Sequence, residues 1–171
     1  PVPVIARLHG DGYAGGVGLA SVCDIRVAAH GVQICLSEAK LGLLPATIAP
    51  YVVRAMGESA ARRYFVTAER FDAAKAQSFG MLHAVVEPDQ LDTTIDGLLD
   101  AIVANGPQAT RACKALVADV AGTPNTAELR AHTVNLIADI RASDEGREGV
   151  QAFLNKRKPD WLGASHGSEA V

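Results

Sequence analysis

The hydrophobic residues of this chain follow two different patterns, and the change falls near Pro50. Before Pro50, short apolar runs rich in β-branched residues are separated by glycines and polar residues, which is typical of short strands joined by tight turns. A cluster of glycines between residues 10 and 18 interrupts the first run. This part of the chain is predicted to contain strands over 3–8, 25–29 and 32–36, a helix over 15–23, and a two-residue hairpin turn at His30-Gly31.

After Pro50, apolar residues recur at the three- and four-residue spacing of amphipathic helices. One exception is the run 82–86, which predicts a last strand or extended connection. Asp72 and Ser143 are candidate N-caps, and Gly80 and Gly106 are candidate helix ends. We expect helices over 51–56, 58–66, 73–79, 88–104, 107–121, 125–142 and 144–157.

The composition narrows the class of protein. With 171 residues, of which 49% are hydrophobic and 20% charged, the chain suits one soluble domain or a large part of one. It has no apolar run near the roughly 20 residues of a membrane-spanning helix and no basic-then-apolar leader, so we expect a cytoplasmic protein without membrane insertion. The formal net charge of -3 and the lack of a basic stripe argue against a nucleic-acid partner.

The cysteines do not form a recognisable framework. Cys23, Cys35 and Cys113 are odd in number and contain no CxxC pair. We interpret them as reduced residues rather than disulfide partners or zinc ligands, and we expect no metal site.

The glycine cluster contains a literal G-x-G-x-x-G motif over 10–15, between a predicted strand and a predicted helix, as in a dinucleotide site. Such a site also needs an acidic residue about 20 residues on, at the end of the next strand, and Asp24 comes too early for that role. A second interpretation is that Gly15 and Gly16 leave backbone N–H groups available at a helix start, where they can hold an oxyanion such as a thioester enolate. The plain alternative, a tight turn with close backbone packing, stays open.

Glu38 is the candidate acid-base residue. It follows the apolar strand 32–36 and lies in a stretch, 36–43, with few other polar groups. A carboxyl group that is partly removed from water exchanges protons nearer neutral pH than an exposed one, which suits general acid-base catalysis. Two structural roles are also open for it: a glutamate at a helix start, or an ion-pair partner of Lys40.

Six segments of the chain resemble the enoyl-CoA hydratase/isomerase family, also called the crotonase family. They are 3–6, 9–10, 14–20, 23–28, 37–45 and, near the far end, 143–159. The similarity runs from residue 3 to residue 160, in order and with few gaps. It implies an α/β fold with a spiral core of ββα turns and a C-terminal helical region, the N-terminal portion of the family fold being missing. Residues 1–86 are then the C-terminal part of the spiral core, 87–162 the helical trimerisation and CoA-covering region, and 163–171 a polar tail.

The resemblance also implies roles for particular residues. Gly15 matches the glycine whose backbone N–H forms half of an oxyanion hole for an acyl-CoA thioester, the other half coming from the missing N-terminal part. Glu38 matches the second of two glutamates that hydratases of the family use. The first glutamate falls at Gly18, where this sequence departs from the family pattern. Catalysis is therefore expected to depend on Glu38 and Gly15, and the acyl group is expected to lie against Ala14, Gly16, Gly18, Pro45 and Tyr51.

A finer resemblance, over 45–53 and 61–71, is to the methylglutaconyl-CoA and isohexenylglutaconyl-CoA hydratases of leucine and terpene breakdown. Those enzymes act on enoyl thioesters that carry a second carboxylate, and Lys40 or Arg54 is the candidate partner of that group. Phe153 and Lys156 match positions that line the CoA pocket, although a basic residue near a helix end is also favoured by the helix dipole. The family implies a homotrimer or a dimer of trimers, and no cofactor beyond the CoA of the substrate.

The sequence thus predicts a lyase that adds water across the 2,3 double bond of an enoyl-CoA, with a glutaconyl-type thioester as the expected substrate. Isomerase or decarboxylase chemistry with a single carboxylate stays open. So does a non-catalytic CoA-binding fragment or subunit, because the 171-residue chain lacks one oxyanion donor and is expected to have little or no activity alone. A nucleotide-binding oxidoreductase is the weakest alternative.

Overall fold

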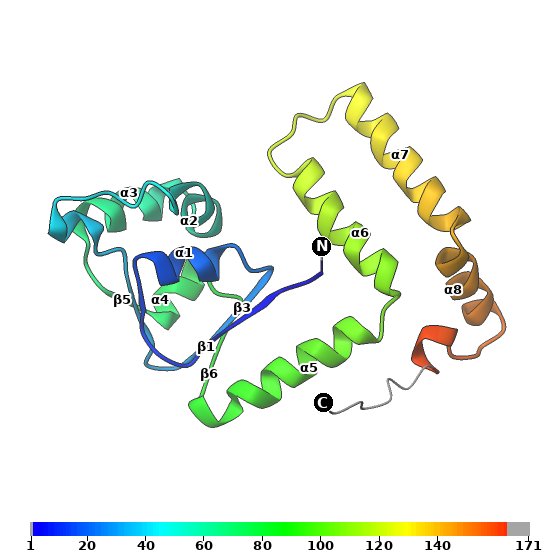
Figure 1. Ribbon diagram of the computed structural model, residues 1–171, viewed down its shortest axis with the longest axis horizontal. Coiled ribbons are helices and arrows are strands. Elements are labelled where there is room, and N and C mark those ends of the chain that lie inside the picture. The colour runs from blue at the N-terminus through cyan, green and yellow to red at the C-terminus, as the bar shows by residue number, and fades with distance from the viewer. Residues whose placement is uncertain (1, 164–171) are drawn as a thin grey trace, which may run out of the picture. The chain divides into compact units, whose positions relative to one another are not determined.

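The computed structural model describes residues 2–163, which fall into two compact units, residues 3–98 and residues 99–163 together with Val2 (Figure 1). The first unit contains strands and helices, and the second is helical. The division falls inside the helix α5 (Leu91–Val103), whereas the sequence analysis divided the chain after residue 86. Of the polar tail expected over 163–171, only Gly163 lies within the described residues.

Two small sheets form the framework of the first unit. One sheet is parallel throughout, in the order β1 (Ile5–Leu8), β3 (Ile25–Ala29) and β6 (Ala84–Val86). In the other, β4 (Gln33–Cys35) pairs in parallel with β2 (Gly12–Tyr13) and antiparallel with β5 (Phe71–Asp72). Helices alternate along the chain with strands that pair mostly in parallel, which confirms the predicted α/β class.

The predicted hairpin at His30-Gly31 is wrong. β3 and β4 belong to different sheets and do not pair with each other. The chain does turn at this point, because Gly31 has a φ of 92°, a conformation open to glycine. The backbone N–H of His30, however, donates to the carbonyl of Val86 at 2.6 Å and so extends the pairing of β3 with β6.

The helices of the first unit confirm the predicted helices to within two residues at either end. They are α1 (Gly15–Ser21), α2 (Ala49–Met56), α3 (Glu58–Thr67) and α4 (Ala73–Ser78). α2 begins before Pro50 because proline is tolerated in the first helical turn, where its missing N–H has no partner to lose. Two short 3₁₀ helices, η1 (Glu38–Leu41) and η2 (Pro88–Gln90), complete the unit.

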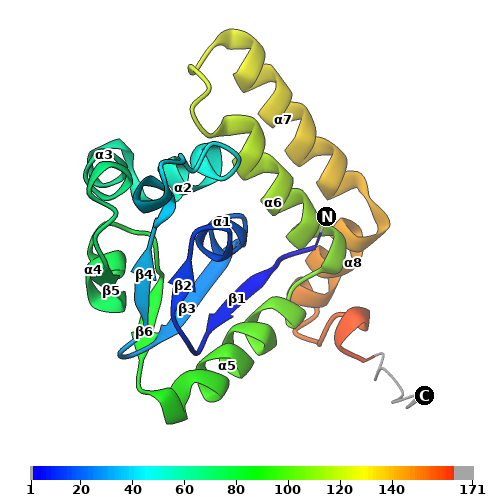
Figure 2. The same cartoon turned by 60° about the vertical axis from the view of Figure 1, so that its left-hand side comes forward.

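The core of the first unit lies between its strands and helices, and α1 packs against both β2 and α2 (Figure 2). The rings of Tyr64, Phe71 and Phe79 pack against one another within this core in tilted and edge-on arrangements, with centroids 4.2 to 5.9 Å apart. Burial of these side chains supplies the main driving force for folding of the unit. Several other side chains are at most 1% exposed: Val27, Ile34, Leu36, Val52 and Met81.

The second unit continues from α5 through α6 (Pro107–Val120), α7 (Ala127–Ala142), α8 (Asp144–Leu154) and the 3₁₀ helix η3 (Asp160–Leu162). The predicted N-cap Ser143 is confirmed, since its Oγ accepts from Gly146 N–H at 3.0 Å, as Asp72 Oδ1 accepts from Lys75 N–H at 2.7 Å for α4. α8 ends at Leu154, before the predicted residue 157. No residue of α6 or α7 is buried within the part of the chain that the structure describes.

Candidate active site

Two neighbouring parallel strands end at the same edge of their sheet, and the chain turns after each of them. Tyr13 of β2 lies opposite Cys35 of β4, and the next residue, Ala14, donates its N–H to the carbonyl of Cys35 at 3.0 Å. Gly15 begins α1, separated from the end of β2 by Ala14 alone, and Glu38 follows shortly after β4. The pairing therefore brings the backbone at Gly15 and the segment of Glu38 to one edge of the sheet.

The backbone turns sharply between β2 and α1. Ala14 has φ 45° and ψ -116°, a region that residues with a Cβ seldom occupy, and such strain concentrates at functional sites. Its carbonyl accepts from Val17 N–H at 3.0 Å and from Gly18 N–H at 3.3 Å. The N–H groups of Gly15 and Gly16 donate to no acceptor among residues 2–163, and both glycines are exposed. These two amides are therefore free to donate to a ligand, which is what the predicted oxyanion site requires.

Glu38 carries an unusual carboxylate. It is half-buried at the start of η1, and its Oε2 is buried without any hydrogen-bond partner among the described residues. A buried polar atom without a partner costs free energy, so such an atom needs an explanation, for example a ligand or a water that it contacts during function. The alternative of an ion pair with Lys40 is not seen, because Lys40 Nζ lies 4.0 Å from the thiol of Cys35 instead.

The position of the family's first glutamate is closed. Gly18 is buried in α1, and a Cβ added there would lie 2.6 Å from Cβ of Ile48. Nothing in the local sequence of residues 45–50 indicates that the side chain of Ile48 meets α1. Position 18 therefore faces the hydrocarbon side chain of Ile48 and carries no carboxylate.

The remaining predicted acyl-site residues of the first unit lie in the segments around these groups. Ala14 is half-buried, Pro45 is buried and its carbonyl accepts from Ala49 N–H at 2.9 Å, and Tyr51 is 49% exposed on α2. The exposed side chains of neighbouring segments are apolar to an unusual degree. They are Leu19, Val22, Leu41, Leu43 and Leu44.

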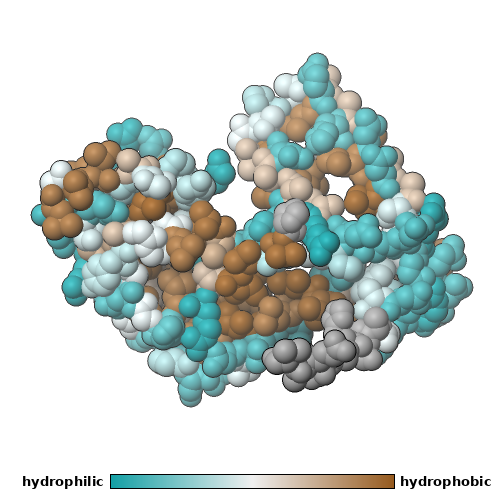
Figure 3. All heavy atoms as spheres, in the orientation of Figure 1, coloured by the Kyte–Doolittle hydropathy of each residue, from teal (hydrophilic) through white to brown (hydrophobic). Residues whose placement is uncertain are grey.

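A groove of about 790 Å³ runs along β1 and reaches the start of α1. Tyr13, Gly16 and Leu19 lie on its wall, together with the residues of β1 itself. Figure 3 shows apolar atoms gathered around β1. β1 is also the edge strand of its sheet, so one side of its backbone is unpaired within the described residues.

Phe153 and Lys156, the predicted CoA-contacting residues, lie in the second unit at the end of α8. The side chain of Phe153 is 81% exposed, and Lys156 turns the chain with a φ of 50°. These positions belong to a different unit from Glu38, and the structure describes each unit by itself.

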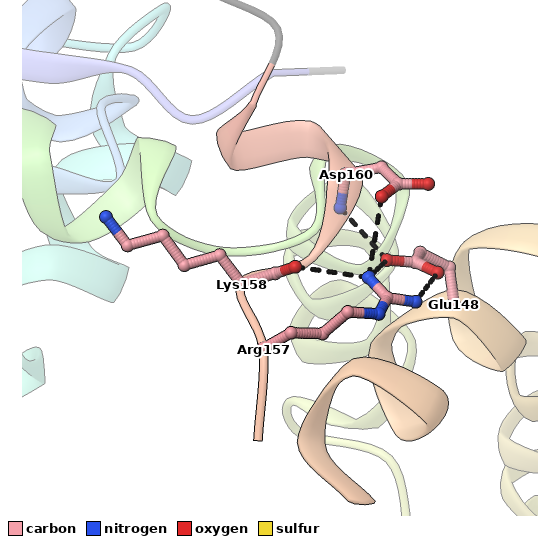
Figure 4. A network of polar contacts seen from close by, with 4 residues as sticks. All are labelled: Glu148, Arg157, Lys158 and Asp160. Carbon is pink, nitrogen blue, oxygen red and sulfur yellow. Dashed lines mark hydrogen bonds and ion pairs between the residues drawn. The ribbon is translucent and has the colours of Figure 1, made fainter. Parts of the chain in front are cut away.

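A network of polar contacts holds the segment after α8 (Figure 4). Arg157 donates from Nη1 to Glu148 Oε1 at 2.5 Å and from Nη2 to Oε2 at 2.7 Å, and Asp160 N–H donates to the same carboxylate at 3.0 Å. The hydrogen bonds from Arg157 lower the pKa of Glu148 to about 2. Arg157 is thereby committed to internal contacts, while the side chain of Lys158 extends away from the network. This pairing, nine residues apart and across a helix end, has no local sequence signal.

No group of three His, Cys, Asp or Glu side chains comes together within residues 2–163 as a set of metal ligands. No helix in the same part of the chain is long and apolar enough to cross a membrane.

Comparison with known proteins gives a consistent result. Residues 1–164 match the family model described as Enoyl-CoA hydratase/isomerase. The chain is 36% identical over 159 residues to Enoyl-CoA hydratase AKT6-1 of Alternaria alternata, covering 92% of this chain and 53% of that protein. It is 32% identical over 160 residues to Enoyl-CoA hydratase EchA19 of Mycobacterium tuberculosis, covering 93% and 60%.

The solved structures agree with the sequence relatives. A crystal structure of an enoyl-CoA hydratase from Shewanella pealeana superposes with a TM-score of 0.89 and 43% sequence identity, over 93% of this chain and 59% of that one. The fold is therefore shared with enoyl-CoA hydratases. The chain spans only about half to three-fifths of the length of these relatives.

Proposed function

The chain belongs to the enoyl-CoA hydratase/isomerase family, and from this membership we propose that the intact protein adds water across the 2,3 double bond of an enoyl-CoA thioester. The observation that carries the proposal is Oε2 of Glu38, which is buried at the sheet edge where α1 begins and has no hydrogen-bond partner among residues 2–163. A carboxylate oxygen kept away from both water and protein donors is suited to hold and transfer a proton of the substrate or of an attacking water.

In the proposed reaction a backbone N–H group stabilises the thioester oxygen and Glu38 transfers protons. The N–H of Gly15 donates to the thioester oxygen and stabilises the negative charge that develops there. Glu38 takes a proton from water while the water oxygen forms a bond to C3, and the electron pair of the double bond moves onto the thioester as an enolate. Glu38 then returns its proton to C2 and the carbonyl is restored. The sum is one water added and the carboxylate regenerated.

A second oxyanion donor is proposed to come from the part of the protein outside this chain. The chain covers little more than half of its relatives, and β1 offers an unpaired edge beside an apolar groove that reaches Gly16. A further strand pairing with β1 supports both the fold and the site, because pairing would satisfy the exposed backbone groups.

The proposed substrate class is a glutaconyl-type thioester, whose second carboxylate needs a cation. Lys40 lies two residues from Glu38, and Arg54 lies on α2, the helix that follows the site segment. Neither side chain makes an ion pair within residues 2–163, so both are available to a ligand carboxylate, and Lys40 is the one nearer the reacting groups in sequence.

The CoA end of the substrate is proposed to meet Phe153 and Lys156. The exposed ring of Phe153 offers a stacking surface for an adenine, and Lys156 a positive charge for a phosphate. The network around Arg157 supports this, because it holds the turn that carries Lys156.

We propose the homotrimer, or dimer of trimers, on the basis of apolar helical surface. Val117 on α6 and Val134 and Ile137 on α7 are each more than 60% exposed in the single chain, as expected for faces that pack against another subunit. A cytoplasmic location is proposed too, and it is supported by three cysteines that form no disulfide.

The test is an assay of the full-length protein against its Glu38→Gln variant, with crotonyl-CoA and a glutaconyl-type CoA ester. Removal of the proton-transferring group is expected to lower kcat by about 10² to 10⁴. Glu87→Gln, an exposed glutamate at the start of η2, is the matched control and should retain parental activity. Equal rates in the parent and Glu38→Gln would remove Glu38 from the mechanism.

Double-bond isomerisation is the second candidate, and the absence of a carboxylate at Gly18 favours it. With one carboxylate, Glu38 can take a proton from C4 and deliver it to C2 without adding water. Mass spectrometry of the product separates the two reactions, because hydration adds the mass of one water to the substrate and isomerisation leaves its mass unchanged. Binding of CoA esters by calorimetry with neither product formed would support a non-catalytic CoA-binding protein instead.

A further inference from the structure

Gly18 and Ile48 form a contact that admits no larger residue at position 18. A Cβ placed on Gly18 would lie 2.6 Å from Ile48 Cβ and closer still to Ile48 Cγ2. Real Cβ atoms do not approach other atoms so closely, so even alanine at position 18 requires Ile48 to move.

Ile48 is not a freely moving side chain. It is the N-cap of α2, and its carbonyl accepts from Tyr51 N–H at 3.1 Å and from Val52 N–H at 3.0 Å. Its half-buried side chain packs against the hydrophobic core, where Val52 is fully buried one turn later. Displacement of Ile48 would therefore disturb the start of α2.

The contact lies beside the proposed oxyanion amide. Gly18 follows Gly15 by three residues on α1, so both lie on the same side of the helix, separated by about one turn, or roughly 5 Å. The side chain of Ile48 thus covers the helix face next to the N–H that would bind the thioester oxygen. The portion of an acyl chain near C3 and C4 would meet hydrocarbon at this point.

We propose that Ile48 is a specificity-determining residue of the acyl site: it fills the space over Gly18, presents hydrocarbon there, and limits the length of the acyl chain. This inference rests on the proposed function, since it assumes that an acyl-CoA binds at Gly15 and Glu38. It goes beyond that function by naming the side chain that sets the size and the polarity of the acyl pocket.

The experiment uses the full-length protein and the variants Ile48→Ala, Gly18→Ala and the double variant. Two measurements are made on each. One is kcat/KM for hydration of crotonyl-CoA and of trans-2-hexenoyl-CoA, and the other is the Kd of the saturated analogues butyryl-CoA and hexanoyl-CoA. Ile95→Ala, which removes the same side-chain atoms from a residue of α5 that also packs against the core, is the matched control, and Tm is recorded for every variant.

We expect Ile48→Ala to raise the hexenoyl-to-crotonyl ratio of kcat/KM about tenfold, because hydrophobic pockets discriminate by roughly 10-fold or more per removed methylene step. Gly18→Ala alone should lower Tm and both activities. In the double variant the added methyl occupies part of the vacated space, so Tm should recover relative to Gly18→Ala and the ratio should fall back. Ile95→Ala should lower Tm and leave the ratio at the parental value.

The outcomes are distinguishable. An active parent in which Ile48→Ala folds but keeps the parental ratio of kcat/KM and of Kd would overturn the role of Ile48 and leave the hydratase proposal standing. A parent that binds both analogues without turnover would overturn hydration, while a Kd ratio shifted by Ile48→Ala would still support Ile48 as the residue that limits the acyl chain.

Discussion

The backbone N–H of Ala14 donates to the carbonyl oxygen of Cys35 at 3.0 Å, one step beyond the parallel pairing of Tyr13 with Cys35. This hydrogen bond joins the end of β2 to the end of β4. Gly15 follows Ala14 directly, and Glu38 follows Cys35 by one short segment, so both proposed catalytic groups depend on this bond for their placement. The unusual φ of Ala14 lets its N–H face β4 while its carbonyl accepts from the first turn of α1.

Ala14→Gly should stabilise the protein by about 1 kcal/mol. A non-glycine residue in this region of φ and ψ costs about 1 to 3 kcal/mol of stability, and glycine removes that cost. Glycine also makes the unfolded chain more flexible, which lowers the free energy of unfolding by roughly 0.5 to 1 kcal/mol. The free energy of unfolding in urea measures the difference. Ala60→Gly, at the third residue of α3, is the control and should lose about 1 kcal/mol. An equal loss in both variants would show that Ala14 is not strained.

Glu38→Met should raise the free energy of unfolding by about 1 to 2 kcal/mol while abolishing turnover. The buried Oε2 without a partner carries a desolvation cost of about 1 to 3 kcal/mol, which a thioether of similar length avoids. Chemical denaturation checks this prediction. Glu87→Met, at an exposed position, should change stability by no more than about 0.5 kcal/mol. A Glu38→Met variant less stable than the parent would indicate that the carboxylate has a partner in solution.

Arg157→Ala should return the pKa of Glu148 from about 2 toward its ordinary value of 4.5, because the guanidinium hydrogen bonds are the main cause of the shift. A carboxyl group whose pKa falls on folding stabilises the folded state above its ordinary pKa, and this stabilisation is lost as the pH falls from 4.5 toward 2. Carboxyl ¹³C NMR titration of Glu148 measures both values. Arg62→Ala, which removes the partner of Glu58 on α3, should leave Glu148 at about 2.

Acid should weaken the fold through His83. Burial lowers the pKa of this ring below 6.5, the positive charge of Arg26 lowers it further, and Arg26 N–H donates to Nδ1 at 2.9 Å. The unfolded chain therefore binds the proton more readily, so the contribution of His83 is present above pH 6.5 and is lost as the pH falls below it. Urea unfolding between pH 7 and pH 5 should show a slope that His83→Gln reduces. His30→Gln, at an exposed turn, should keep the parental slope, and identical slopes in all three proteins would contradict the assignment.

Local patterns predicted most of the helices of this chain. Asp72 and Ser143 were identified as N-caps because a short polar side chain before an apolar run has one favoured use, and both accept a hydrogen bond from the first helical turn. The strands are less predictable from sequence than the helices. β2 and β5 have only two residues each, too few to show an alternating pattern. His30-Gly31 has residue types typical of a hairpin turn, but the strands on either side of it do not pair with each other.

Some features of the candidate site follow from local sequence, and others depend on the tertiary structure. Gly15 and Glu38 could be identified in the sequence, because a glycine at a helix start and a glutamate after an apolar strand are read from their immediate neighbours and from the family pattern. Their convergence at one sheet edge, the isolation of Glu38 Oε2 and the closure of Gly18 by Ile48 could not. Sequence neighbours determine helix starts and caps, because the hydrogen bonds involved span only a few residues. Which strands pair, and which side chain fills the space beside α1, is decided by how distant apolar faces pack, and that depends on the whole unit at once.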